Sequence, residues 1–202
     1  MKIVIISGSH RKNSESGRVA NYIKNNLNNI APEVEAQILS LEGNPIPLWD
    51  EDVWKDDPEW KKVWGPYSDM LKSADGFVVV TPEWGGMVPS GLKNLFILST
   101  KNELSHKPAL IVAVSSGVGG AYPIAELRTS SYKNSRICYI PDQVIIRTVT
   151  EMLKTETPAS SHDEKIRIRI EYSLKVLLEY SKALSHIKSS PLLDYKNYPF
   201  GM

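Results

Sequence analysis

The run KIVIISGSHRKNSESGR occupies residues 2–18 and has two contrasting parts. It opens on four consecutive apolar residues, Ile3–Ile6, which are typical of a short buried strand. Glycine, serine and basic residues follow, and a helical apolar pattern then continues as far as Pro32. A buried strand that passes through such a turn into a helix predicts the opening unit of a parallel α/β sheet.

The rest of the chain repeats this alternation. After the opening strand, Ile3–Ser7, we expect strands over Val34–Leu41, Gly76–Thr81, Pro108–Ser115 and Gln143–Val149. Helical patterns separate them, at residues 59–73, 89–100 and 121–135, and a capping-box spacing at Ser161–Glu164 opens a last helix. Residues 34–38 alternate apolar and polar, which indicates an edge strand. The pattern predicts a flavodoxin-like, doubly wound, five-stranded parallel sheet of order 2-1-3-4-5, with three α/β/α layers.

Length and composition narrow the function. The chain has 202 residues and a net charge of +1, so we expect one domain over residues 1–190 and an irregular tail over residues 191–202. The charge gives no reason to expect nucleic acid or a membrane as a partner. The single cysteine, Cys138, forms neither an internal disulfide nor a zinc site by itself, and we expect no metal. The opening apolar run is shorter than a signal peptide requires, so we expect a cytoplasmic protein.

Unusual loops follow the first, third and fourth strands, at residues 8–18, 82–89 and 115–120. Ligands of open α/β sheets bind at the carboxyl ends of the strands, where these loops meet. The first loop suits a phosphate, because Ser9, Ser14 and Ser16 offer hydroxyl groups, Arg11 offers a guanidinium group, and a helix N-terminus attracts anions. The alternative is an ordinary turn in which Ser14 or Ser16 is the N-cap.

The other two loops suit a flat heterocycle. Trp84 is followed by Gly85 and Gly86, so an aromatic ring and closely approaching backbone occur together. Residues 115–120 read SSGVGG, and their backbone N–H groups are able to contact the polar edge of a ring. The alternatives are a tryptophan packed under its own loop and a flexible turn.

At these loops the sequence resembles the NADPH-dependent FMN reductase family, over about residues 1–150. GSHRKNS at residues 8–14 matches the family pattern Gly-Ser-x-Arg-x-x-Ser. PEWGGMVP at residues 82–89, with LKN at residues 92–94, is similar to Pro-Glu-Tyr-Asn-x-Ser-x-Pro followed by Leu-Lys-Asn. A Gly-Gly turn at residues 119–120, before Leu-Arg at residues 127–128, is a weaker third match.

The resemblance implies a non-covalently bound FMN that passes electrons from NADPH or NADH to a small acceptor: a flavin, a quinone, an azo compound or a metal oxyanion. It also implies a homo-oligomer, either a dimer or a tetramer. The implied phosphate contacts are Ser9, Arg11, Ser14 and Ser16. The implied isoalloxazine contacts are Pro82, Glu83, Trp84 and Gly85, with Ser116, Gly117 and Gly119 near the other edge of the ring.

Two departures from the family pattern leave other functions open. Gly85 and Met87 replace a polar asparagine and serine, which keeps a flavin-free relative of the fold as one alternative. A flavodoxin-type electron carrier is another, although Arg11 and the charge of +1 argue against it. Because the flavin itself supplies the hydride chemistry, no side chain is assigned as catalytic, and we expect His10 to be exposed to solvent.

Overall fold

The computed structural model describes residues 1–55 and 57–201, and it contains a five-stranded parallel sheet of order β2-β1-β3-β4-β5. This is the predicted order. The strands are β1 (Lys2–Ser7), β2 (Glu35–Ser40), β3 (Gly76–Pro82), β4 (Pro108–Val114) and β5 (Cys138–Ile146). The α-helices are α1 (Glu15–Ile30), α2 (Pro58–Ser73), α3 (Ser90–Leu98), α4 (Ala121–Ser130) and α5 (Ser161–Lys188).

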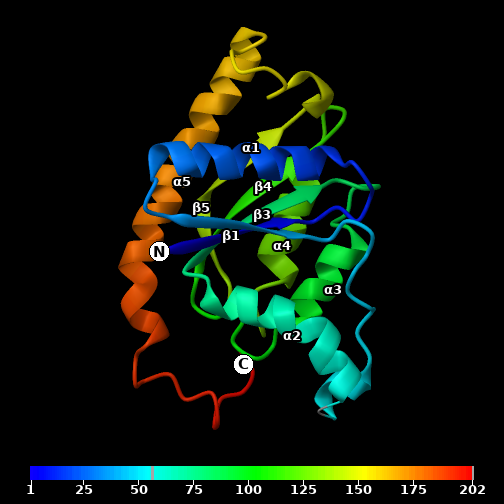
Figure 1. The fold of residues 1–202 in the computed structure, drawn as a ribbon, viewed down its shortest axis with the longest axis vertical. Coiled ribbons are helices and arrows are strands. Elements are labelled where there is room, and N and C mark those ends of the chain that lie inside the picture. Colours follow the sequence, from blue (N-terminus) through cyan, green and yellow to red (C-terminus); the bar gives the residue numbers. More distant parts are fainter. Residues whose placement is uncertain (56, 202) are drawn as a thin grey trace.

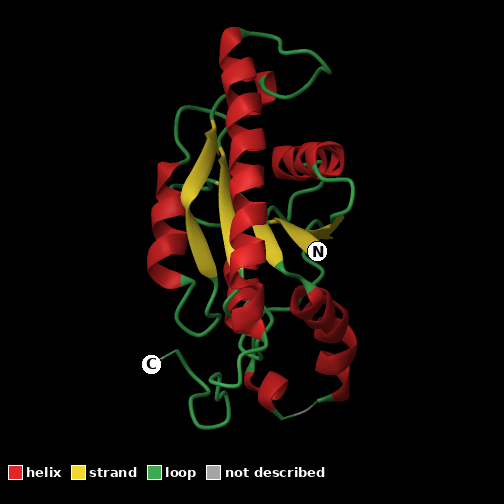
Figure 2. Ribbon diagram, turned by 90° about the vertical axis from the view of Figure 1, so that its left-hand side faces the viewer, coloured by secondary structure: helices red, strands yellow, loops and turns green. Residues whose placement is uncertain are grey.

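Helices cover both faces of the sheet (Figure 1). Helices α1 and α5 bury apolar side chains against one face, and α2, α3 and α4 bury theirs against the other. Figure 2 shows α5, which has 28 residues, running along the sheet. Strands β3 and β4 are buried at every position, because they lie between neighbouring strands and between two helical layers. Strand β2 pairs only with β1, which confirms the predicted edge strand.

Several predicted boundaries were wrong. Strand β5 begins at Cys138 and ends at Ile146, whereas the sequence predicted residues 143–149. Pro141 has no N–H to donate and is unfavourable within a strand, so the sequence did not predict the first half of this edge strand. The register of β5 against β4 also shifts in this half. At the other end, Thr148 adopts a left-handed conformation with φ +43°, and a short 3-10 helix, η2 (Val149–Glu151), begins there.

Two helix ends also differ from the prediction. Helix α4 stops at Ser130 instead of Ser135; near its end, the hydroxyl groups of Thr129, Ser130 and Ser131 donate to carbonyl groups four residues back. The N-cap of α5 is Ser160, whose hydroxyl oxygen accepts from the N–H of Asp163, so the capping motif lies one residue earlier than expected. Among the described helices, none combines the length and apolar character needed to cross a membrane.

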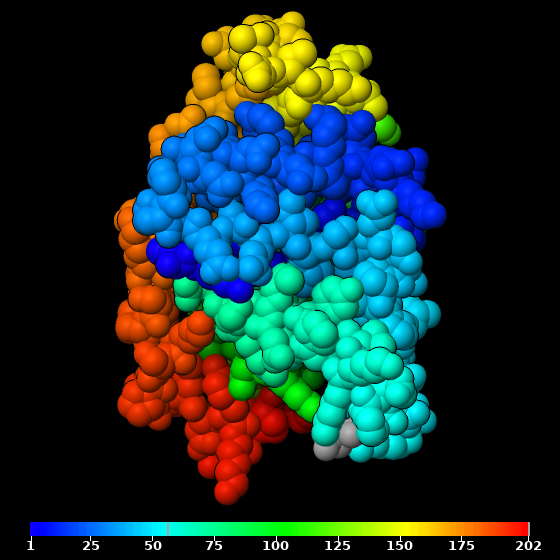
Figure 3. Space-filling view, in the orientation of Figure 1, coloured from blue at the N-terminus to red at the C-terminus, as the bar shows by residue number. Residues whose placement is uncertain are grey.

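The segment between β2 and α2 is long and includes a 3-10 helix, η1 (Glu51–Trp54). In Figure 3 this cyan segment runs down one side of the molecule, from beside the start of α1 to α2. Asn94 of α3 fixes it, because its side-chain oxygen accepts from the N–H of Trp49 (2.8 Å) and its amide nitrogen donates to the carbonyl of Pro47 (2.7 Å). The asparagine of the Leu-Lys-Asn motif therefore has a structural role in this chain.

Candidate functional site

The three loops singled out in the sequence lie together at the carboxyl end of the sheet. Residues 8–14 follow β1, residues 83–89 follow β3 and residues 115–120 follow β4. Strand β3 lies between β1 and β4, so the second loop lies between the first and the third. We call these segments the carboxyl-end loops.

The first loop is compact and ends in a capped helix. Ser14 is the N-cap of α1, and its Oγ accepts from the N–H of Gly17 (3.1 Å). Ser9 is buried and its Oγ accepts from the N–H of Arg11 (3.3 Å), while Ser16 is buried in the first helical turn. The side chain of Arg11 is exposed. The loop therefore presents a guanidinium group and a helix N-terminus at its surface, and buried serines lie beneath them.

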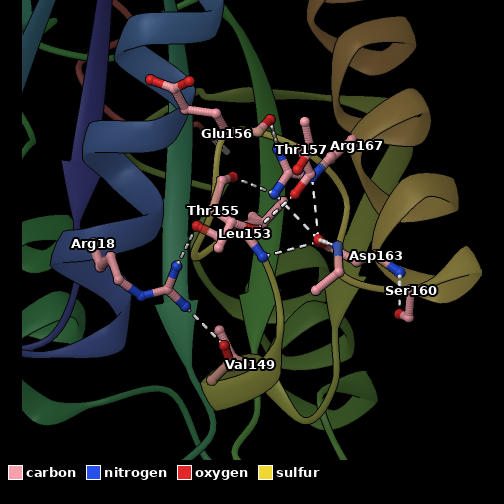
Figure 4. Close-up of polar contacts among 10 residues, drawn as sticks. Arg18, Val149, Leu153, Thr155, Glu156, Thr157, Ser160, Asp163 and Arg167 are labelled. Carbon is pink, nitrogen blue, oxygen red and sulfur yellow. Dashed lines mark hydrogen bonds and ion pairs between the residues drawn. The ribbon is translucent and has the colours of Figure 1, made fainter.

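The start of α1 is tied to the segment after β5. The guanidinium of Arg18 donates to the carbonyls of Leu153 (2.8 Å) and Val149 (2.7 Å), as Figure 4 shows. The same segment is held from α5, where the buried carboxylate of Asp163 accepts from the N–H of Leu153 (2.9 Å) and from Arg167. Burial alone would raise the pKa of Asp163, but the N–H groups of Ala159 and Leu153 and the charge of Arg167 outweigh it and lower the pKa. Arg18 is thus engaged in structure rather than facing a ligand.

His10 is partly buried, so the expectation of an exposed histidine was wrong. Its ring meets the ring of Trp84 edge-on, with 4.6 Å between the centroids and 81° between the planes. Its Nδ1 atom is buried and has no hydrogen-bond partner in the part of the chain that the structure describes. The contact joins the first loop to the second.

The second loop is a tight two-residue turn. Trp84 and Met87 exchange backbone hydrogen bonds, each of 3.0 Å, and Gly85 and Gly86 between them have φ values of +57° and +77°. Two consecutive positive φ angles are the requirement of a type I′ turn, which glycine and asparagine tolerate best. Gly85 suits this conformation, and so does the asparagine that the family pattern has at this position. The departure removes a side chain without removing the turn.

The side chain of Glu83 is directed at the third loop. Its Oε2 accepts from the N–H of Gly120, and a Cβ atom added to Gly119 would lie 2.7 Å from its Oε1. Pro82 ends β3 and is buried. Of the four residues proposed from the sequence to line a ring, Trp84 and Gly85 are therefore better placed to face a ligand than Pro82 or Glu83.

The second loop is also fastened to α4. The N–H of Val88 donates to the carboxylate of Glu126 (2.7 Å), and Lys93 forms an ion pair with the same group. Burial would raise the pKa of Glu126, but the hydrogen bonds from Lys93 and Val88 and the Lys93 charge lower it overall. Glu126 was not identified from the sequence, because its partners lie more than thirty positions away.

The third loop is exposed at Ser116, Gly117 and Val118, and the side chain of Val118 is 83% exposed. The carbonyls of Ser115 and Gly117 accept from the N–H groups of Val149 (3.1 Å) and Thr148 (2.9 Å). Within the described residues, the backbone N–H groups of Ser116, Val118 and Gly119 have no acceptor. Unpaired donors at an exposed turn are available to a ligand. The donors of the third loop fit the polar edge of a heterocycle, and those of the first loop fit a phosphate.

A hollow of about 620 Å³ lies between α3 and α4, and no residue of the first or third loop lines it. Apolar side chains from distant segments contribute to its lining: Trp49, Trp54, Phe96, Ile97 and Phe200. Ile97, Trp54 and Phe200 remain more than half exposed. Leu92 and residues 95–98 of α3 are apolar, so this helix carries apolar side chains on more than one face.

Comparison with known proteins agrees with these features. The family described as NADPH-dependent FMN reductase matches residues 1–151. An NADPH azoreductase of Bacillus sp. (strain OY1-2) is 30% identical over 147 residues, which cover 72% of this chain and 76% of that protein. A quinone reductase of Escherichia coli (strain K12) is 37% identical over 126 residues, covering 60% of this chain and 64% of that protein. This chain thus spans just under two thirds of the quinone reductase.

Solved structures show the same fold. The flavoenzyme NAD(P)H:(acceptor) oxidoreductase FerB from Paracoccus denitrificans superposes with a TM-score of 0.70 at 20% identity, over 91% of this chain and 98% of that one. An NADH:FMN oxidoreductase in its apo form gives a TM-score of 0.64 at 18% identity, over 94% and 91% of the two chains. The predicted flavodoxin-like fold is confirmed.

Proposed function

Because this chain belongs to the NADPH-dependent FMN reductase family, we propose that it is an oxidoreductase that binds FMN non-covalently and passes electrons from NADPH or NADH to a small acceptor. The names of its relatives favour a quinone or an azo compound as that acceptor. The observation that carries the proposal is the set of unpaired backbone donors in the third loop, at the same edge of the sheet as a helix N-terminus and an exposed arginine in the first loop.

In this proposal the first loop holds the FMN phosphate. Arg11 and Ser14 are the accessible side chains, and Ser9 and Ser16 form the floor beneath them. A guanidinium fork and hydroxyl groups at a helix N-terminus match the charge and the acceptor atoms of a phosphate monoester.

The second and third loops hold the ring system. Trp84 and the backbone at Gly85 cover one part of it. The unpaired N–H groups of Ser116, Val118 and Gly119 meet its polar edge, where Gly117 also lies, and Pro82 and Glu83 support the loops from behind. Bound FMN supplies the hydride chemistry, and the chain binds it, orients it and limits which molecules reach it. No side chain is assigned a proton-transfer role.

The decisive experiment is a visible spectrum of the purified protein with added FMN, followed by anaerobic titration with NADPH and with NADH. We expect flavin absorbance that remains with the protein after gel filtration and is bleached by at least one nicotinamide nucleotide. A quinone or azo dye should then restore the oxidised spectrum. A protein that retains no FMN, or a yellow protein that neither nucleotide bleaches, would contradict the proposal.

We propose further that the chain acts in the cytoplasm as a homodimer or homotetramer that covers the outer face of α3. The exposed apolar side chains Ile97, Met87, Trp54 and Leu48, which are 54%, 53%, 67% and 66% exposed, support an interface there. Light scattering of the wild type should give a multiple of the 22.6 kDa chain mass, and Ile97→Asp should reduce it. A wild type that stays monomeric at high concentration would refute this part alone.

A further inference from the structure

The peptide unit between Gly119 and Gly120 is held at both ends by charged side chains. Nε of Arg147 donates to the carbonyl oxygen of Gly119 (3.1 Å) and to that of Val118 (2.7 Å). From the opposite direction, the carboxylate of Glu83 accepts from the N–H of Gly120. Arg147 follows β5 and Glu83 follows β3, the two neighbours of β4 in the sheet, so the third loop is fixed from both sides.

These contacts determine where the free donors of the loop point. A trans peptide is planar, and its C=O and N–H groups point in opposite directions. The carbonyls of Ser115, Gly117 and Val118 are turned toward residues 147–149, where Val149, Thr148 and Arg147 donate to them. The N–H groups of Ser116, Val118 and Gly119 belong to the same peptide units, so they point away from residues 147–149, toward the side on which Glu83 lies.

The glycines of the loop fit this arrangement. A Cβ atom at Gly119 would lie 2.7 Å from Oε1 of Glu83, and one at Gly120 would lie 2.5 Å from Cγ2 of Ile145. Gly120 also has a φ of +103°, which side chains disfavour. Glycine at these two positions is therefore needed for the carboxylate and the strand to approach the backbone closely.

We propose that Arg147 and Glu83 are positioning residues that hold the third loop with its N–H groups directed at the polar, electron-rich edge of bound FMN. This inference rests on the proposed function and adds to it a residue, Arg147, that lies outside the family motifs quoted above. The N–H groups stabilise negative charge on that edge, and such charge increases when the flavin is reduced. Loss of the Arg147 contacts therefore weakens FMN binding and lowers the reduction potential of the bound flavin.

The test compares Arg147→Met and Arg147→Lys with Arg169→Met. Arg169 is an exposed arginine that forms an ion pair with Asp142, outside the third loop, so it controls for the loss of one surface charge. Hydrogen exchange in the FMN-free protein reports on the loop itself. Fluorescence titration gives the FMN dissociation constant, and anaerobic redox titration gives the potential.

We expect Arg147→Met to speed amide exchange at Gly120, Thr148 and Val149, whose N–H groups are hydrogen-bonded at the third loop. It should also weaken FMN binding by about 10-fold through loosened hydrogen bonds, and lower the potential. The lysine variant should recover part of each change, because an ammonium group still donates to a carbonyl, and Arg169→Met should match the wild type. Two variants of Glu83 provide a second approach if Arg147→Met does not fold. Glu83→Ala removes the acceptor of the Gly120 N–H and should weaken FMN binding. Glu83→Gln should recover part of that loss, because its amide oxygen still accepts from Gly120.

The outcomes separate this inference from the proposed function. A wild type that binds no FMN overturns both. A wild type that binds FMN, together with an Arg147→Met variant equal to it in exchange, affinity and potential, overturns the inference alone. An Arg169→Met variant that changes as much as Arg147→Met also overturns it, because general surface charge would then explain the result.

Discussion

The polar groups at the two ends of β4 differ in whether they have hydrogen-bond partners within the protein. At its carboxyl end, residues 115–120 leave backbone donors exposed and unpaired within the described chain. At its amino end, Lys107 is almost fully buried, and its Nζ donates to the carbonyls of Leu71 (2.8 Å), Lys72 (2.9 Å) and Glu103 (2.8 Å). The carboxylate of Glu103, also fully buried, accepts from the hydroxyl of Ser68 (2.8 Å) and the N–H of Lys101 (2.6 Å).

The difference separates stability from binding within one strand. At the amino end, buried polar groups find partners within the protein, and they fix the last turn of α2 to the start of β4. At the carboxyl end, Arg147 and Glu83 hold the backbone in place, but the N–H groups of Ser116, Val118 and Gly119 stay unpaired within the described residues and are available to a ligand. Substitutions at the amino end should therefore change the free energy of unfolding, and substitutions in the carboxyl-end loops should change ligand affinity.

The largest effect is expected at the amino end. Lys107→Met removes three hydrogen bonds, including the one to the buried carbonyl of Glu103, so it should reduce the free energy of unfolding by about 2–4 kcal/mol. Urea unfolding followed by circular dichroism measures the change. The FMN affinity of the folded variant should be unchanged.

Lys175→Met is the matched control, because Lys175 is exposed and forms a surface ion pair with Glu171. Its unfolding should match that of the wild type closely. If Lys107→Met were as stable as this control, the buried hydrogen bonds at the amino end would contribute little to the free energy of unfolding. The proposed difference between the two ends of β4 would then be wrong.

The reverse pattern is expected for Arg11→Ala. Removal of a charged hydrogen bond to phosphate should weaken FMN binding by about 1.5–3 kcal/mol, while unfolding of the FMN-free protein changes little because the side chain is exposed. Fluorescence titration and urea unfolding of the same preparation measure both quantities. Unchanged FMN affinity would refute the phosphate assignment of the first loop.

Sequence patterns were sufficient for the sheet order and for the carboxyl-end loops. Apolar runs, helical periodicity and glycine clusters are local, and parallel strands then bring the loops after β1, β3 and β4 together. The same patterns show where a ligand is expected without showing which way each side chain turns. Glu83 was assigned to a ring from its motif, but its carboxylate faces Gly120.

The residues that the sequence did not reveal make contacts between distant positions. Arg18 reaches Leu153, Arg147 reaches Val118 and Lys107 reaches Leu71, and no local periodicity marks such pairs. Strand β5 was misplaced for a related reason: its pairing with β4 overrides the unfavourable Pro141 within it. Long-range contacts of this kind become visible only in the folded structure.

A smaller effect should appear as a dependence of stability on pH. Burial, with a further contribution from the Lys188 charge, lowers the pKa of Lys107 from its ordinary value of 10.5 to about 7. Between these two values the unfolded chain binds more protons than the folded one at this residue, so its contribution to stability rises with pH. The gain between pH 7 and pH 8 should be about 1 kcal/mol.

The measurement is urea unfolding at several pH values for the wild type and for Lys107→Met. The difference between the two profiles isolates this lysine from the other titrating groups of the chain. The wild type should gain stability relative to the variant as the pH rises from 7 to 8. Parallel profiles would show that Lys107 keeps its charge in the folded protein, held by its three carbonyl partners.

The smallest effect concerns the second loop, where the cost of a positive φ angle can be separated from the cost of a steric clash. A Cβ atom at Gly85 would meet only Cε of Met87, at an ordinary 3.8 Å, so the positive φ of +57° is the sole obstacle to a side chain there. Gly85→Ala should therefore cost about 1 kcal/mol, and Gly85→Asn less, because asparagine tolerates the left-handed region. Urea unfolding of the two variants tests the ranking.

An alanine variant as stable as the asparagine variant would mean that the turn is not held in its type I′ form, and that the backbone contacts proposed for Gly85 are not preorganised. If the ranking holds, the family's asparagine and this chain's glycine meet one backbone requirement, and a difference in FMN affinity between Gly85→Asn and the wild type would then measure the asparagine side chain alone.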